Sequence, residues 1–162
     1  MDEFPKWENR IRRAVLCDSV EIYETCVKSI MFSAPTHYSQ EQISAWVARI
    51  QASTFRRKIP RLHFMVAEAE LGVIAGFVAL EPITHELEYI YVHPEFQRSG
   101  LGRQLLEVAE QHARDQGIRK LHLVGSLNAL GFYEHLGFIE DRRILRDLSG
   151  TQVPCALMSK EI

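Results

Sequence analysis

The first third of the chain carries apolar residues at intervals that predict amphipathic helices. A short apolar run at 11–16 predicts a strand, and Asp18 after it has the chemistry of a helix N-cap. The apolar positions that follow recur close to the helical period, at Val20, Ile22, Tyr23, Val27, Ile30 and Met31. Ser39, with Gln42 after it, is a capping-box pattern that predicts a second helix. We therefore expect the order strand, helix, loop, helix.

Runs rich in apolar and aromatic residues replace this pattern in the middle of the chain. The runs are 62–69, 73–80 and 86–92, and Gly72 and Pro82 mark the turns between them. Apolar runs of this length between turn residues are typical of strands joined in hairpins. The three segments therefore predict an antiparallel meander.

The C-terminal half alternates predicted helices and strands. We expect a helix over about 100–116 with Gly117 as its C-cap, and its buried stripe consists of Leu101, Leu105, Val108, Ala109 and His112. The later elements are a strand at 121–124, a short helix at 128–136 that Gly137 closes, and a hairpin over 138–158.

These elements together predict the fold class. The strand, helix and strand between residues 86 and 124 have the length of a parallel βαβ unit, whereas turns join the other strands. The order β-α-α-β-β-β-α-β-α-β-β then favours an α/β (α+β) domain of three layers, with a mixed, mostly antiparallel sheet covered by helices. A length of 162 residues suggests that 1–162 form one domain.

Composition narrows the function classes. The formal net charge of −2 argues against nucleic-acid binding, because no excess of cations exists to neutralise phosphates. No apolar run is long enough for a membrane span, and the N-terminus does not read as a signal peptide. Three cysteines without a C-x-x-C pair favour a reducing cytoplasm and no zinc site. His85-Glu86 lacks the second histidine of a metalloprotease motif, so we expect no metal.

The segment 97–103, Gln-Arg-Ser-Gly-Leu-Gly-Arg, joins a predicted strand to a predicted helix. Free N–H groups and the helix dipole at such a start favour a phosphate or diphosphate, and Arg98 and Arg103 can add charge-assisted contacts. Gly100 and Gly102 let an anion approach the backbone, although close packing also explains such glycines. The dinucleotide fingerprint is disfavoured, because Leu105 occupies its third glycine position.

Three blocks of sequence resemble the GNAT acetyltransferase superfamily. Residues 97–102 match its Q/R-x-x-G-x-G/A signature, and residues 87–94 resemble its fourth strand. Residues 128–138 resemble its N-x-x-x-x-F-Y-x-x-x-G-F segment. The resemblance covers about 62–140. It implies the GNAT three-layer fold with splayed fourth and fifth strands.

The resemblance implies acetyl-CoA as cosubstrate. It places the diphosphate on the backbone amides of 98–103 and the pantetheine arm along the fourth strand and Asn128. Asn128 is also a candidate helix cap. The implied binding residues are Ile90, Tyr91, Val92, Gln97, Arg98, Ser99, Gly100, Leu101, Gly102, Arg103, Asn128 and Tyr133.

The resemblance also implies catalytic roles. Tyr133 occupies the position of the family's acid, and a phenol is protonated at neutral pH. A core tyrosine beside Phe132 is the alternative. Glu88 and Glu86 are candidates for the base, with Glu88 favoured, and the alternative is a surface role for both. Cys155 is expected to be a small buried hydrophobe, since direct transfer needs no nucleophile.

The loop between the first two helices usually forms one wall of the acceptor site in this family. Its candidates here are Phe32, His37 and Tyr38, which could contact an amine. An ordinary polar loop is the alternative.

The function that follows is transfer of acetyl from acetyl-CoA to a primary amine by direct attack in a ternary complex. A non-catalytic acyl-CoA-binding sensor on the same fold is the alternative. The sequence does not identify the amine, which could be a small metabolite, a drug or a peptide. Dimers are common in the family, so a homodimer is compatible with the resemblance.

Overall fold

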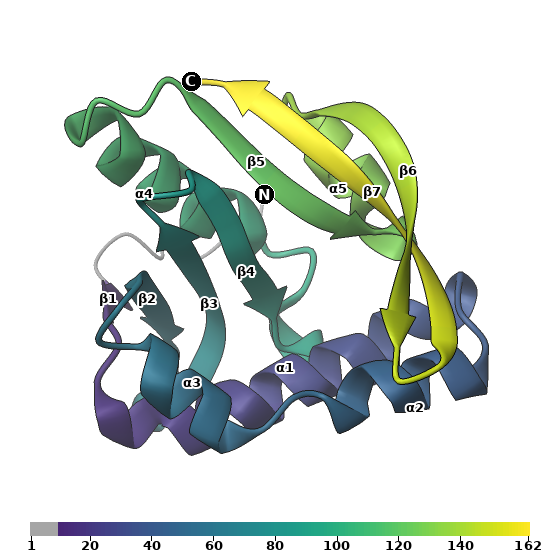
Figure 1. The fold of residues 1–162 in the computed structure, drawn as a ribbon. Helices are drawn as coiled ribbons and strands as arrows, with labels where there is room; N and C mark the ends of the chain where they lie inside the picture. The colour runs from purple at the N-terminus through teal and green to yellow at the C-terminus, as the bar shows by residue number, and fades with distance from the viewer. Residues whose placement is uncertain (1–9) are drawn as a thin grey trace.

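Seven strands form one mixed sheet in the computed structural model, which describes residues 10–162 (Figure 1). In chain order they are β1 (Ile11–Arg13), β2 (His63–Glu68), β3 (Ile74–Glu81), β4 (Glu86–Val92), β5 (Lys120–Ser126), β6 (Ile139–Leu148) and β7 (Thr151–Glu161). Their order across the sheet is β1-β2-β3-β4-β5-β7-β6. Neighbouring strands are antiparallel except β4 and β5, whose parallel pairing confirms the predicted βαβ unit.

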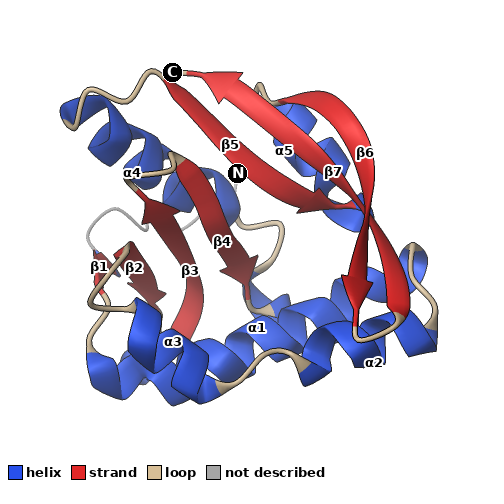
Figure 2. Ribbon diagram, viewed as in Figure 1, coloured by secondary structure: helices blue, strands red, loops and turns tan. Residues whose placement is uncertain are grey.

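Helices cover both faces of this sheet (Figure 2). They are α1 (Ser19–Ser33), α2 (Gln40–Ala48), α3 (Ala52–Lys58), α4 (Leu101–Asp115) and α5 (Leu130–His135). Apolar residues of α1, α2 and α3 share one core with the sheet, and those of α4 and α5 share the other. The arrangement confirms the predicted three-layer fold.

β3 lies between these two cores. Val78 and Leu80 belong to the core under α4, whereas Phe77 and Ala79 belong to the core under α1. This alternation is the period of two expected of a strand. Because both faces are covered, the strand is an almost continuous apolar run in the sequence, with only its last residue partly exposed.

The helix α4 shows where the predicted stripe was right and where it was shifted. Leu101, Leu105 and Ala109 are buried as expected. His112 is only partly buried, and its ring stacks on that of His63, with 3.4 Å between the ring centroids. Gly117 follows the helix with a positive φ of 78°, which confirms it as the C-terminal capping glycine.

The helix α3 was not predicted. Phe55 is its buried residue, so its seven residues show no apolar stripe. Phe55 nonetheless packs edge-on against Phe64, Phe77 and Tyr89 of three neighbouring strands. A single large aromatic ring therefore fixes this short helix on the sheet, and the helix carries Lys58 to the same face.

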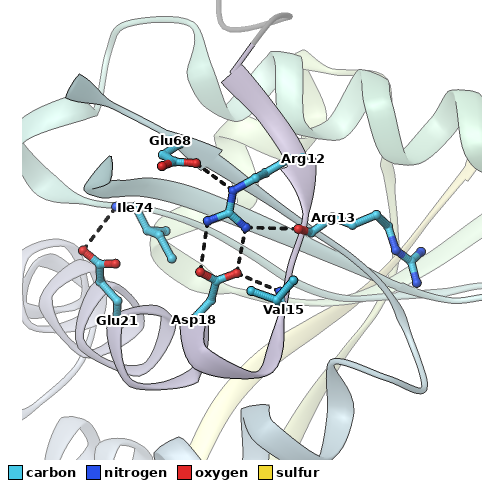
Figure 3. Close-up of polar contacts among 7 residues, drawn as sticks. All are labelled: Arg12, Arg13, Val15, Asp18, Glu21, Glu68 and Ile74. Carbon is cyan, nitrogen blue, oxygen red and sulfur yellow. Dashed lines mark hydrogen bonds and ion pairs between the residues drawn. The ribbon is translucent and has the colours of Figure 1, made fainter. Parts of the chain in front are cut away.

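Asp18 occupies the N-cap position of α1 as predicted, but its carboxylate accepts no hydrogen bond from the helix, and Figure 3 shows the reason. Its carboxylate accepts hydrogen bonds from both terminal nitrogens of Arg12, at 2.8 and 3.0 Å, and from the N–H of Val15 at 2.8 Å. Arg12 Nε donates to Glu68 at 2.6 Å. Burial opposes the charge on Asp18, but the bonds from Arg12 and Val15 outweigh it and lower its pKa. The network ties β1 to β2 and to the turn before α1.

Ser39 caps α2 as predicted. Its hydroxyl accepts from the N–H of Gln42 at 3.2 Å, and the Gln42 side chain accepts from the N–H of Ser39 at 2.9 Å. Within residues 10–162, none of the helices has the length and apolar character that a membrane crossing requires.

Candidate functional site

The loop between β4 and α4 presents free backbone N–H groups. The first backbone bond of the helix runs from Gln104 N to Gly100 O at 3.2 Å, so the N–H groups of 101–103 precede the helical ladder. Gly100 has a φ of 80° and Arg98 a φ of 60°, both in the left-handed region. Successive N–H groups around such residues form a concave anion site.

Charge at this end of α4 also favours an anion. The first turn of the helix contains no acidic residue, while Arg98 and Arg103 both line the adjoining cavity. Cations at the positive end of a helix dipole are unfavourable unless an anion neutralises them. A Cβ on Gly102 would lie 3.1 Å from the Phe132 ring and would force that ring to shift, so close packing also favours glycine here.

The other residues predicted in this segment shape the loop. Gln97 Nε2 donates to Val92 O at 3.1 Å and to Ser33 Oγ at 3.3 Å, which ties the loop to the ends of β4 and α1. Ser99 Oγ donates to Phe96 O at 2.5 Å. The Leu101 side chain is buried in the core, so only its backbone faces the loop.

Beyond the loop, β4 and β5 diverge. Their ladder consists of the single pair Glu86 and His122, as expected of splayed strands. A cavity of about 1100 Å³ extends from the α4 loop through this region to α1, α2 and the β6–β7 hairpin. In Figure 1 the two strands separate toward the start of α4 and the lower end of the hairpin lies against α2.

The backbone of β4 offers two residues to the gap. His93 N donates to Ala75 O at 2.8 Å, and such pairs recur at every second residue of an antiparallel ladder, so the N–H and C=O of Tyr91 face β3. Ile90 and Val92 therefore direct their backbone groups toward β5. Tyr91 lines the cavity with its side chain, and its backbone is not available as the resemblance implied.

Asn128 places an unsatisfied polar atom in the cavity. Its Oδ1 is buried and has no hydrogen-bond partner among residues 10–162. It caps neither neighbouring helix, because the N-cap of α5 is Ala129 and that of the preceding 3₁₀ turn is Ser126. A buried acceptor without a partner costs about 1–3 kcal/mol. An amide N–H of a pantetheine arm is the kind of donor that this atom fits.

Tyr133 lies on α5 and lines the same cavity. It is 8% exposed, and its ring packs edge-on against Phe132 and Phe138. Burial raises its pKa well above the ordinary value of a phenol. Its hydroxyl therefore holds its proton at neutral pH. This placement agrees with both alternatives for Tyr133, the catalytic acid and the core tyrosine.

Both candidate bases line the cavity. The register of β4 on β3 shifts between Ala79 and Leu80, so Glu88 is the extra residue of a bulge. Glu88 forms an ion pair with Lys58 of α3, and the ammonium of Lys58 also lies 5.1 Å from the centre of the Tyr89 ring. The bulge thus lets Glu88 and Tyr89, which are adjacent, both face α3. Glu86 begins β4 beside His122.

The predicted acceptor residues separate into two groups. Phe32 is 65% exposed, and His37 bonds the hydroxyl of Thr36 at 2.8 Å; neither lines the cavity. Tyr38 does line it, with its hydroxyl donating to Pro154 O at 2.6 Å and accepting from Leu127 N at 2.8 Å. Burial raises the pKa of Tyr38 to about 12. Tyr38 is therefore an anchor between the α1–α2 loop and β7.

Several cavity residues escaped the sequence prediction. They are Cys26, Trp46, Arg49, Lys58, His135, Arg146 and Cys155. They come from α1, the region of α2, α3, α5, β6 and β7, so only the tertiary fold brings them together. One signal in the sequence pointed to Arg146. It alternates with Ile144 and Leu148, so the three side chains lie on the same face of a strand.

Known proteins share these features. A family model for the acetyltransferase (GNAT) domain matches residues 34–149. The uncharacterised N-acetyltransferase YafP of Escherichia coli K12 is 30% identical over 112 residues, 69% of each chain. A GCN5-related N-acetyltransferase structure from Rhodopseudomonas palustris has a TM-score of 0.87 at 25% identity over 94% of each chain. The PaiA N-acetyltransferase of Thermoplasma acidophilum, solved with coenzyme A, has a TM-score of 0.75 at 26% identity, covering 94% of this chain and 98% of its own. The chain belongs to the GNAT acetyltransferase superfamily.

Proposed function

We propose that this protein transfers an acetyl group from acetyl-CoA to a primary amine by direct attack in a ternary complex. The observation that carries the proposal is one continuous cavity. It joins the free N–H groups at the start of α4 to Asn128, Tyr133 and Glu88. An anion site, an unsatisfied amide acceptor, a neutral acid and a carboxylate thus lie along one path.

The α4 loop is assigned to the diphosphate. The N–H groups of 98–103 donate to phosphate oxygens, and Arg98 and Arg103 add charge-assisted contacts. The backbone of Ile90 and Val92, together with Asn128 Oδ1, then holds the amide-bearing arm in the gap between β4 and β5. This assignment gives a donor to the buried acceptor that residues 10–162 leave unpaired.

The transfer forms a nitrogen–carbon bond and breaks the carbon–sulfur bond of the thioester. The amine loses one proton and the sulfur gains one. We assign to Tyr133 the proton that the sulfur gains. Its raised pKa keeps the phenol protonated, so it can donate to the leaving thiolate. A backbone N–H of β4 facing the gap is the assigned donor to the developing oxyanion.

Glu88 is assigned to removal of the amine proton, directly or through water, with Glu86 as the second candidate. Lys58 holds the Glu88 carboxylate in place through its ion pair. A carboxylate at this point also attracts the ammonium form of an incoming amine. Replacing each glutamate by glutamine separates the two candidates.

The two cysteines of the cavity support direct transfer. Burial raises the pKa of the Cys26 thiol, and burial likewise raises that of Cys155 despite the nearby charge of Arg146. A thiol that keeps its proton is a poor nucleophile. Neither cysteine forms a disulfide, and the same is true of Cys17. Free thiols support a cytoplasmic location for the protein.

The test is release of free thiol from acetyl-CoA across a panel of primary amines. We expect amine-dependent release that the Tyr133→Phe variant largely loses. A thermal melt with acetyl-CoA, with ATP and NAD as controls, measures binding separately. Selective protection by acetyl-CoA without thiol release on any amine would instead identify a non-catalytic acyl-CoA sensor.

A further inference from the structure

The part of the cavity beyond the thioester position is bounded by α2 and the β6–β7 hairpin. Tyr38 and Gln42 fix this boundary, because both side chains donate to backbone carbonyls of β7, those of Pro154 and Gln152. Alternate residues of β6 face one side of the strand, and Ile144, Arg146 and Leu148 all line the cavity. This acceptor chamber has its own chemistry, distinct from that of the α4 loop.

Two arginines of the acceptor chamber have no carboxylate partner in the part of the chain that the structure describes. Arg49 follows the last turn of α2 and Arg146 lies on β6; both line the cavity and both are exposed. Among residues 10–162 neither forms an ion pair, whereas the third cation of the chamber, Lys58, is paired with Glu88. Burial raises the pKa of Tyr91, and the positive charge of Arg146 opposes that rise. The electric field of Arg146 therefore reaches into the chamber.

The remaining walls of the acceptor chamber are mainly apolar or aromatic. Trp46 packs edge-on against Tyr38 with 5.7 Å between ring centroids, and Tyr89 and Tyr91 face the same cavity from β4. Ile30, Leu148 and Val153 add aliphatic surface. A ligand with an apolar body and one anionic end matches an apolar wall with two unpaired cations at its rim.

We propose that the acceptor is a small primary amine that also carries an anionic group, such as an amino acid, with its amine toward Glu88 and its anion toward Arg49 and Arg146. The inference rests on the proposed function and narrows its substrate class. Two unpaired arginines repel a second cationic centre, so polyamines and aminoglycosides are disfavoured acceptors. A carboxylate and a phosphonate are both anions that an arginine can bind. The test therefore includes one acceptor of each kind.

The test compares matched acceptors at fixed acetyl-CoA. L-phenylalanine is paired with 2-phenylethylamine, 2-aminoethylphosphonate with ethylamine, and spermidine represents polycations. We expect kcat/KM for at least one amine that carries an anionic group to exceed that of its matched amine without the anionic group by about tenfold or more. The arm with the larger ratio tells whether the anion is a carboxylate or a phosphonate.

Variants locate the effect. Arg49→Gln and Arg146→Gln should each lower kcat/KM for the preferred acceptor by about tenfold and leave that for its matched amine without the anionic group unchanged. Arg56→Gln on α3 and Arg142→Gln on β6 remove exposed charges outside the cavity and should change neither rate. Thermal melts of all four variants report whether each is folded.

The outcomes separate the two claims. If the matched amines without an anionic group, or spermidine, are turned over as fast as the amines that carry one, this inference is overturned and the proposed function is left intact. Equal losses in Arg49→Gln and Arg146→Gln for amines with and without the anionic group also overturn it. Absence of thiol release with every amine, despite acetyl-CoA binding, contradicts the proposed function itself.

Discussion

Gly100 offers a sharp test of the anion site, because α4 is flanked by two glycines in nearly the same conformation. Gly100 before the helix has a φ of 80°, and Gly117 after it has a φ of 78°. A Cβ added at either position meets no atom within 4 Å. Replacing each by alanine therefore imposes the same backbone strain without a steric clash. Only Gly100 lines the cavity.

The stability cost should be the same for both. A non-glycine residue in the left-handed region costs about 1–2 kcal/mol. Alanine also lowers the conformational entropy of the unfolded chain, which offsets about 0.4–1 kcal/mol of this cost. We expect Gly100→Ala and Gly117→Ala each to lower the free energy of unfolding by about 1 kcal/mol relative to the parent protein.

Acetyl-CoA affinity should distinguish the two variants. Alanine relieves its strain by turning the loop away from the left-handed region, which moves the N–H groups of 101–103. Loss of one hydrogen bond to a charged group costs about 1.5–3 kcal/mol. Since every 1.4 kcal/mol is tenfold, Gly100→Ala should raise Kd about 10- to 100-fold. Gly117→Ala should leave Kd unchanged.

Isothermal titration calorimetry measures the Kd for acetyl-CoA. Urea unfolding of the free protein measures the free energy of unfolding. Equal destabilisation with unequal affinity supports the anion site. If Gly100→Ala binds acetyl-CoA as tightly as Gly117→Ala while losing the same stability, the N–H groups at the start of α4 do not hold the diphosphate.

Four further substitutions test the remaining residues. Tyr133→Phe should lower kcat about 100-fold or more while the KM for acetyl-CoA changes little, and a near-normal kcat would remove Tyr133 as the acid. Asn128→Ala should weaken acetyl-CoA binding yet leave the free protein equally or more stable in urea, because it deletes an unpaired buried acceptor; a clear loss of stability would indicate a structural bond instead. Glu88→Gln should lower kcat about 100-fold or more with little change in the KM for acetyl-CoA, and if only Glu86→Gln does so, the base is Glu86. Asp18→Asn should destabilise the protein by about 1–3 kcal/mol at neutral pH. The folded pKa of Asp18 is lowered, so its contribution is present above the unfolded pKa and lost as pH falls through the folded one; equal stability of variant and parent at neutral pH would contradict this.

The sequence predicted best where a feature depends on local chemistry. The bounds of β4 agree with the predicted segment, and α4 begins and ends within one residue of its prediction. Gly117 and the Ser39 capping box follow from the conformations that those residues favour. The loop at 97–103 and the splayed strands followed from the family resemblance, which rests on the same local blocks.

Predictions failed where distant side chains compete for a residue. Asp18 suits an N-cap, but Arg12 on β1 reaches its carboxylate and offers a stronger, charged partner. The helix α3 depends on a single buried side chain, so no period marks it in the sequence. The acceptor chamber assembles residues from helices and the β6–β7 hairpin. Arg49 and Arg146 are 97 positions apart in a chain of 162 residues, and no local pattern links them.

The central claim is that the N–H groups opening α4 hold the diphosphate of acetyl-CoA. Titration of ¹⁵N-labelled protein with acetyl-CoA, followed in ¹H–¹⁵N spectra, tests it directly. We expect the amide resonances of residues 98–103 to shift together, whereas those around Gly117 at the other end of the helix should stay in place. Saturating binding that leaves the resonances of 98–103 unmoved would contradict it.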